Sequence, residues 1–166
     1  MSQIKLPFFG NVDSESLDDY YETSCDFAGK EIQVDLTFIN KSIDQKRLDI
    51  TKQFIENLRI HDLNNKKHIQ SDFDNNEDGI VQSYLINHIE DLATDDLNRL
   101  TANAKTADQP KALLKKVHLI RVGIFPDSKG HFSIFDYSLG TTLTDYLIVV
   151  NTDENGNKLG SIRMEF

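Results

Sequence analysis

The sequence predicts an α+β protein in which a central block of helices packs on one side of a mainly antiparallel sheet. Three observations lead to this prediction. Two segments near the N-terminus, residues 20–27 and 31–39, alternate between apolar and polar side chains as half-buried strands do. Apolar residues then recur at helical spacing through the middle of the chain. Residues 117–166 return to short alternating segments separated by turns, and strands segregated from helices in this way are typical of the α+β class.

The two N-terminal segments are predicted to form a hairpin. Within residues 31–39, apolar side chains such as Ile32 and Leu36 fall on one face and polar side chains fall on the other. Gly29 supplies the turn, because glycine adopts a positive φ at little steric cost. Cys25 follows the alternation of the first segment, so we expect it to pack in the core rather than to act as a nucleophile.

The helical block is predicted from apolar spacing and from capping residues. The predicted segments are a single turn at 13–17, a long helix at 42–63 that breaks or continues as a second short helix from Asn64-Asn65 through Phe73, a helix at 79–93, and short helices that begin near Asp95 and Asp108. His88 lies on the apolar edge of the 79–93 helix, where a structural histidine is expected.

The C-terminal part is predicted to be a four-stranded meander. Its strands are expected at residues 117–126, 132–139, 146–152 and 159–166. The short connections force neighbouring strands to be antiparallel, and Asn155-Gly156 is a strong hairpin signal. The first and third strands are apolar on both faces, which indicates strands that are covered on both sides. Either the first hairpin folds over the second face of the sheet, or a second subunit of a homodimer covers it.

The chain is expected to form a single domain over residues 1–166. It comprises an N-terminal hairpin part (1–40), a helical block (41–116) and the C-terminal meander (117–166). The sequence has neither an apolar run of about 20 residues nor a signal-peptide pattern, so no membrane segment is expected. The single cysteine excludes an intrachain disulfide. Together these features favour the cytoplasm.

The charge distribution points to a protein partner. The net charge is −9, and a negative surface repels the phosphate backbone of nucleic acids, so we expect no nucleic-acid binding. The acidic residues are either solvated faces or a patch that meets a basic partner, such as a basic toxin. The partner-binding residues predicted on the second interpretation are Asp72, Asp74, Glu77, Asp78, Asp95 and Asp96.

A second group of polar residues lies in the predicted meander. Asp136 falls inside a strand, where intrinsic preference disfavours an acidic residue. It either pairs with Arg121 or Arg163 across the sheet or takes part in binding. The alternative function is therefore an enzyme or a small-molecule-binding protein with a site near Asp136. The candidate residues of this site are His118, Arg121, His131, Asp136, Tyr137 and Asp145, and the two histidines, on adjacent predicted strands, could approach one another.

No complete catalytic, cofactor-binding or metal-binding motif occurs in the sequence. Residues 74–79 match the first half of a calcium-binding loop, with glycine at the sixth position. The twelfth position, which needs a bidentate acid, is Leu85. A calcium-binding module at residues 74–79 is therefore a third alternative, and we expect no catalytic residues, no cofactor and no metal.

Parts of the meander resemble a family of small bacterial α+β proteins that is classed as a domain of unknown function. The resemblance rests on Arg121–Pro126 (RVGIFP), Phe135–Gly140 (FDYSLG) and Thr144–Val150 (TDYLIVV), and on LPFFGNVD before the first hairpin. It covers nearly the whole chain and implies the α+β fold and a bacterial origin, with no catalytic residues to carry over. It also suggests small acidic immunity factors. The leading hypothesis is a non-enzymatic cytoplasmic protein that acts by binding another protein, and a toxin-neutralising immunity factor is one form that such a protein would take.

Overall fold

The computed structural model describes residues 2–166 and confirms the α+β class. The strands are β1 (Gln3–Leu6), β2 (Gly10–Asp13), β3 (Tyr20–Phe27), β4 (Lys30–Thr37), β5 (His118–Ile124), β6 (Ser133–Ser138), β7 (Leu147–Thr152) and β8 (Lys158–Glu165). The helices are α1 (Gln45–Glu56), α2 (Leu58–Asn75), α3 (Ile80–Asp91), α4 (Thr94–Leu100), the 3₁₀ helix η1 (Thr106–Asp108) and α5 (Gln109–Leu114).

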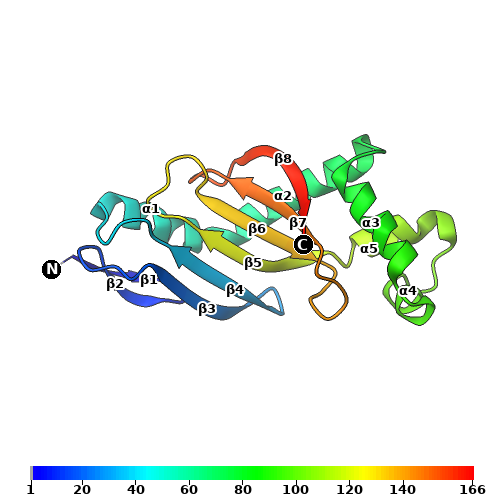
Figure 1. The fold of residues 1–166 in the computed structure, drawn as a ribbon, viewed down its shortest axis with the longest axis horizontal. Helices are drawn as coiled ribbons and strands as arrows, with labels where there is room; N and C mark the ends of the chain where they lie inside the picture. The colour runs from blue at the N-terminus through cyan, green and yellow to red at the C-terminus, as the bar shows by residue number, and fades with distance from the viewer. Residues whose placement is uncertain (1) are drawn as a thin grey trace.

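Strands β3 to β8 form one six-stranded sheet in chain order (Figure 1). The predicted hairpin and the predicted meander are both confirmed, and all their internal pairings are antiparallel. The two parts join through β4 and β5, which are parallel because the helical block between them returns the chain to the end of the sheet where β4 began. The hairpin therefore extends the sheet edge to edge and does not fold over its second face.

Helices α1 and α2 cover one face of the sheet, and Figure 1 shows α2 running behind it. Phe54 of α1 packs its ring against Phe132 and Phe135, with ring centroids 5.0 and 6.1 Å apart. Tyr137 of β6 donates a hydrogen bond from its hydroxyl to Asp62 Oδ1 of α2, at 2.8 Å. Helices α3, α4 and α5 lie beyond one end of the sheet (Figure 1). The opposite face carries no helix among the described residues, and we call it the uncovered face.

The long helix breaks at a different place from the one predicted. Asn57 separates α1 from α2, and its backbone N–H donates to the carbonyls of Gln53 and Phe54. Asn64 and Asn65 instead lie inside α2, which runs on to Asn75. Packing against the sheet overrides the low helix propensity of asparagine here. None of the helices within residues 2–166 combines the length and the apolar character that crossing a membrane requires.

A bulge in β5 corrects the prediction that this strand is apolar on both faces. The register with β6 shifts between Leu119 and Arg121. Because the shift inserts one extra residue, Leu119 and Val122 both face the helices and are buried. Arg121 and Gly123 then face the uncovered side. The same prediction is confirmed for β7, where Val149 on the uncovered face is only 1% exposed.

A hairpin at the extreme N-terminus was missed by the sequence analysis. Residues 3–6 and 10–13 pair as β1 and β2 in a small separate sheet, in place of the expected lead-in, and a turn follows at residues 14–16. Leu6 and Val12 are buried in the core, at 1% and 2% exposure. Strands of four residues carry too few alternations to be recognised from periodicity alone.

The first turn of α2 is packed against the turn that joins β7 to β8. His61 stacks on Phe54 with ring centroids 4.4 Å apart and is 7% exposed. Gly156 also lies against this imidazole, so closely that a Cβ there would be 2.1 Å from Nδ1. His61 is therefore packed against both an aromatic ring and a glycine backbone.

We expect the free energy of unfolding to fall as the pH drops below the ordinary histidine value. Burial lowers the pKa of His61 below 6.5, and Asp153 offsets this only in part. Below 6.5 the unfolded chain takes up a proton that the folded chain resists, so stability is lost until the lowered pKa is reached. Urea denaturation at about pH 7.5 and about pH 6 tests this, with a smaller loss expected for His61→Gln.

The matched control for this measurement is His131→Gln, which alters an exposed histidine. A loss of stability in His131→Gln as small as that in His61→Gln would show that the effect is not specific to His61. An equal loss in all three proteins would show that His61 does not contribute.

Candidate functional site

The predicted polar site of the meander divides between the two faces of the sheet. Asp136 and Tyr137 are neighbours in β6, so their side chains point in opposite directions. Tyr137 faces α2, whereas Asp136 lies on the uncovered face beside Arg121. The predicted convergence of these two residues is therefore wrong.

The two histidines of this predicted site do not meet either. His118 pairs with Ser138 at one end of the β5–β6 hairpin, and Ser133 pairs with Ile124 at the other. His131 precedes Ser133 and lies at that far end. Asp145 does not begin a strand but is exposed in the connection before β7. Antiparallel pairing places residues near the two ends of a hairpin far apart, which explains the error.

Arg121 is the centre of a charged cluster on the uncovered face. Its Nε and Nη2 donate to Oδ2 and Oδ1 of Asp35, at 2.7 and 2.9 Å, and its Nη1 donates to Asp136 Oδ2 at 3.2 Å. The predicted pairing of Asp136 with Arg121 is thus confirmed. Asp35 was not predicted as a second partner of Arg121. It gave the same sequence signal as Asp136, because it too is an acidic residue inside a predicted strand. We call these three residues the Arg121 cluster.

The two carboxylates of the Arg121 cluster are buried although no helix covers them. Asp35 is fully buried and Asp136 is 5% exposed, because the guanidinium lies across both carboxylates. Gly123 makes room for it, since a Cβ at this position would be 2.9 Å from Arg121 Nη2. Burial raises the pKa of Asp136 even though Arg121 opposes this, and the hydrogen bonds that Arg121 donates to Asp35 raise the pKa of Arg121. The cluster carries one net negative charge.

The uncovered face as a whole is acidic. The strand registers place six carboxylates on it and two guanidinium groups: Glu22, Asp26, Glu31, Asp35, Asp136 and Glu165, with Arg121 and Arg163. One end of the face is hollowed into an apolar cavity of about 390 Å³, lined by Ile39, Phe125, Ser128, His131, Ile134, Asn151 and Arg163. Ile39 at its rim is 76% exposed. The face therefore combines negative charge with an apolar hollow.

The acidic surface predicted from the sequence does not form one patch. Asp72, Asp74, Glu77 and Asp78 lie before α3, and Asp95 and Asp96 follow it at the start of α4. A helix of 12 residues, about 18 Å long, therefore separates the two groups. Several of these carboxylates have structural roles: Asp72 accepts from the backbone N–H of Val81 at 3.0 Å, and Asp96 pairs with Arg99. Capping and local pairing therefore explain Asp72 and Asp96 without a partner.

Residues 74–79 also lack the geometry of a calcium-binding loop. Asp74 and Asn75 form the last turn of α2, so the first positions of the expected loop are helical. Gly79 is the N-cap of α3, with Asp72 rather than Asp78 bonded to the helix start. Within residues 2–166, no group of three or more histidine, cysteine, aspartate or glutamate side chains could hold a metal ion.

His88 and Cys25 have structural surroundings, as the sequence analysis expected. His88 is 4% exposed, and its Nδ1 lies 2.6 Å from the carbonyl oxygen of Tyr84, so Nδ1 carries the proton. Its Nε2 forms a hydrogen bond with the Thr144 hydroxyl, at 2.7 Å. This bond joins α3 to the β6–β7 connection. Cys25 packs against the core, and burial raises the pKa of its thiol, which makes it a poor nucleophile.

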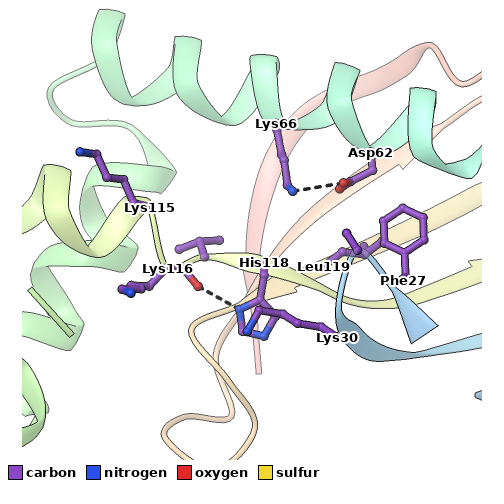
Figure 2. A pocket seen from close by; sticks show the side chains of 10 residues that line it. Phe27, Lys30, Asp62, Lys66, Lys115, Lys116, His118 and Leu119 are labelled. Carbon is purple, nitrogen blue, oxygen red and sulfur yellow. Dashed lines mark hydrogen bonds and ion pairs between the residues drawn. The ribbon is translucent and has the colours of Figure 1, made fainter. Parts of the chain in front are cut away.

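A basic cavity that sequence reasoning missed lies on the helix-covered side of the sheet. Its volume is about 320 Å³. Three separate segments line it: the β3–β4 turn, α2, and the junction of α5 with β5 (Figure 2). The lining residues are Phe27, Ala28, Lys30, Asp62, Lys66, Lys115, Lys116, Val117, His118 and Leu119. We call it the lysine cavity. Of the four lysines of the cavity, only Lys115 and Lys116 are neighbours in the sequence. The other two come from distant segments.

Comparisons with protein-family models, with curated proteins and with solved structures found no match to this chain. The bacterial family and the immunity role that the sequence suggests therefore stay predictions.

Proposed function

We propose that this protein binds a basic partner protein through the uncovered face of its sheet. The supporting observation is the excess of carboxylates on that face beside an apolar hollow. Opposite charge on a partner would steer the encounter, and an apolar side chain of the partner would enter the hollow as an anchor. This arrangement suits a cytoplasmic bacterial immunity factor that masks the basic surface of a toxin.

The charge on the uncovered face also favours a different partner over a second copy of the chain. Six carboxylates against two guanidinium groups leave a net charge of −4 on each copy. Two such faces would repel one another, whereas a basic surface would be attracted. A homodimer through this face is therefore disfavoured.

The experiment is affinity capture from the organism that encodes the chain, at low salt, with paired charge-reversal variants. Glu22→Lys/Glu31→Lys changes the uncovered face, and Glu77→Lys/Asp78→Lys makes the same change of charge at the helical end. We expect the first variant to lose the captured basic protein and the second to keep it. The same partner retained by the first variant and lost by the second would contradict the proposal.

The hollow is tested separately with Ile39→Asp. Ile39 is 76% exposed, so the substitution should leave the fold intact. With a purified partner, we expect a faster dissociation rate and about tenfold weaker binding, since a buried anchor governs dissociation more than association. Surface plasmon resonance measures both rates, and an unchanged dissociation rate would exclude the hollow from the interface.

A further inference from the structure

We propose that the lysine cavity binds a small molecule that carries a phosphate group. This site lies on the helix-covered side of the sheet and is independent of the uncovered face. Three features of the lysine cavity support this assignment: its positive charge, its size and apolar walls, and the hydrogen bonds that position its polar groups.

The lysine cavity concentrates positive charge in an acidic protein. Four lysines and one carboxylate line it, although the chain as a whole has a net charge of −9. Within residues 2–166, three of these lysines form no ion pair: Lys30, Lys115 and Lys116. Like charges at one cavity repel one another, and an anion bound between them would remove that repulsion. Lysine ammonium groups are common phosphate ligands.

The one carboxylate of the cavity cannot neutralise these lysines, because it is already engaged. Asp62 is 3% exposed and accepts a hydrogen bond from the buried Tyr137 hydroxyl. Its other oxygen lies 3.2 Å from Lys66 Nζ. Figure 2 shows Lys66 reaching from α2 to this carboxylate. Asp62 thus positions one lysine and forms no ion pair with the other three.

The dimensions of the lysine cavity fit a small organic phosphate. Its volume of about 320 Å³ is at the lower end of ligand pockets in proteins. Phe27, Val117 and Leu119 supply apolar walls beside the lysines, so the carbon part of a ligand would have surfaces to contact. A molecule the size of a sugar phosphate or a mononucleotide meets both conditions.

His118 provides a local probe of the site. Its Nδ1 donates to the carbonyl oxygen of Lys116 at 2.9 Å, which leaves Nε2 free (Figure 2). Burial lowers the pKa of His118, the hydrogen bond to the Lys116 carbonyl opposes this, and the charges of Lys30 and Lys66 lower the pKa further. A bound phosphate would offset these two lysines, so the pKa of His118 should rise when the cavity is filled.

The test is a titration of the full chain with AMP as the probe, followed by calorimetry and by NMR of the histidine rings. We expect saturable binding and a rise in the pKa of His118. Lys30→Gln/Lys116→Gln should weaken binding about tenfold or more, because it removes two unpaired lysines of the cavity. Lys105→Gln/Lys111→Gln removes the same charge from exposed lysines outside the cavity and should leave binding unchanged.

Three outcomes would overturn the proposal. The first is no saturable binding of AMP or inorganic phosphate by the wild type up to about 10 mM. The second is an equal loss of binding in the two lysine variants, which would indicate a nonspecific effect of net charge. The third is citrate binding more tightly than AMP, which would assign the cavity to carboxylates. Glu22→Lys/Glu31→Lys changes the other side of the sheet. The result of the partner-capture experiment with that variant therefore does not affect this test of phosphate binding.

Discussion

Replacing Arg121 with methionine is expected to lower the free energy of unfolding by about 3 kcal/mol at neutral pH. The substitution leaves two carboxylates of the Arg121 cluster, Asp35 and Asp136, buried within reach of each other without their shared cation. Removing one partner of a buried ion pair costs about 3–5 kcal/mol, and the lower value applies because the Arg121 side chain is 33% exposed. Urea denaturation of the wild type and the variant measures the difference.

The pH dependence of this loss identifies its cause. Burial already raises the pKa of Asp136, and without Arg121 that pKa would rise further. The folded variant then binds a proton at a pH at which the unfolded chain does not, so its deficit is largest at neutral pH and shrinks as the pH falls. A deficit caused only by lost packing would not change with pH.

Two further variants separate charge from packing in the Arg121 cluster. Arg163→Met removes a half-exposed arginine from the same face, and its pair with Glu165 should contribute less than about 1 kcal/mol. Asp35→Asn/Arg121→Met/Asp136→Asn removes all three charges and should recover much of the lost stability. A cost for Arg121→Met no larger than that for Arg163→Met would contradict the assignment.

Gly156→Ala is expected to cost about 3 kcal/mol, with two separate causes. Gly156 has a φ of +82°, a left-handed conformation that costs a residue with a Cβ about 1–2 kcal/mol. The new methyl group would also lie 2.1 Å from His61 Nδ1, so the imidazole must leave its stack on Phe54. Such overpacking costs about 1–3 kcal/mol. Urea denaturation at neutral pH, above the range in which His61 titrates, measures the loss.

A double-mutant cycle with His61→Ala distinguishes the two causes. Without the imidazole, Gly156→Ala should cost only the part that comes from its backbone conformation. Gly130→Ala is the matched control, because nothing lies within 4 Å of a Cβ there and its φ is not left-handed. We expect that control to change stability by less than about 0.5 kcal/mol. A cost of Gly156→Ala that does not depend on His61 would exclude the steric part.

Most of the strands could be predicted from alternation, because one face of each packs on the core. The two N-terminal strands of the main sheet and the four strands of the meander all lie where periodicity placed them. The bulge after Leu119 could not be predicted, since one inserted residue reverses the faces without changing the apolar composition. Because of this reversal, the sequence did not predict that Arg121 and Gly123 share the uncovered face.

The candidate sites were less predictable because each depends on segments far apart in the chain. Asp136 and Arg121 lie on consecutive strands, so their pairing could be inferred. Asp35 reaches Arg121 across 86 positions, through a parallel pairing that no local pattern reveals. Lys30, Lys66 and Lys116 likewise line one cavity only because the fold brings the β3–β4 turn and α2 beside the start of β5. The spacing of residues along the sequence does not reveal contacts between such distant segments.

The parallel contact of β4 with β5 has a consequence for how the chain folds. The hairpin and the meander can each form from contacts close in sequence, whereas joining them requires closure of a loop that spans the entire helical block. The bond between Arg121 and Asp35 crosses this joint, so we expect it to form after the main folding barrier. In stopped-flow measurements, Arg121→Met should then mainly accelerate unfolding, and a mainly slower folding rate would show that the joint closes early.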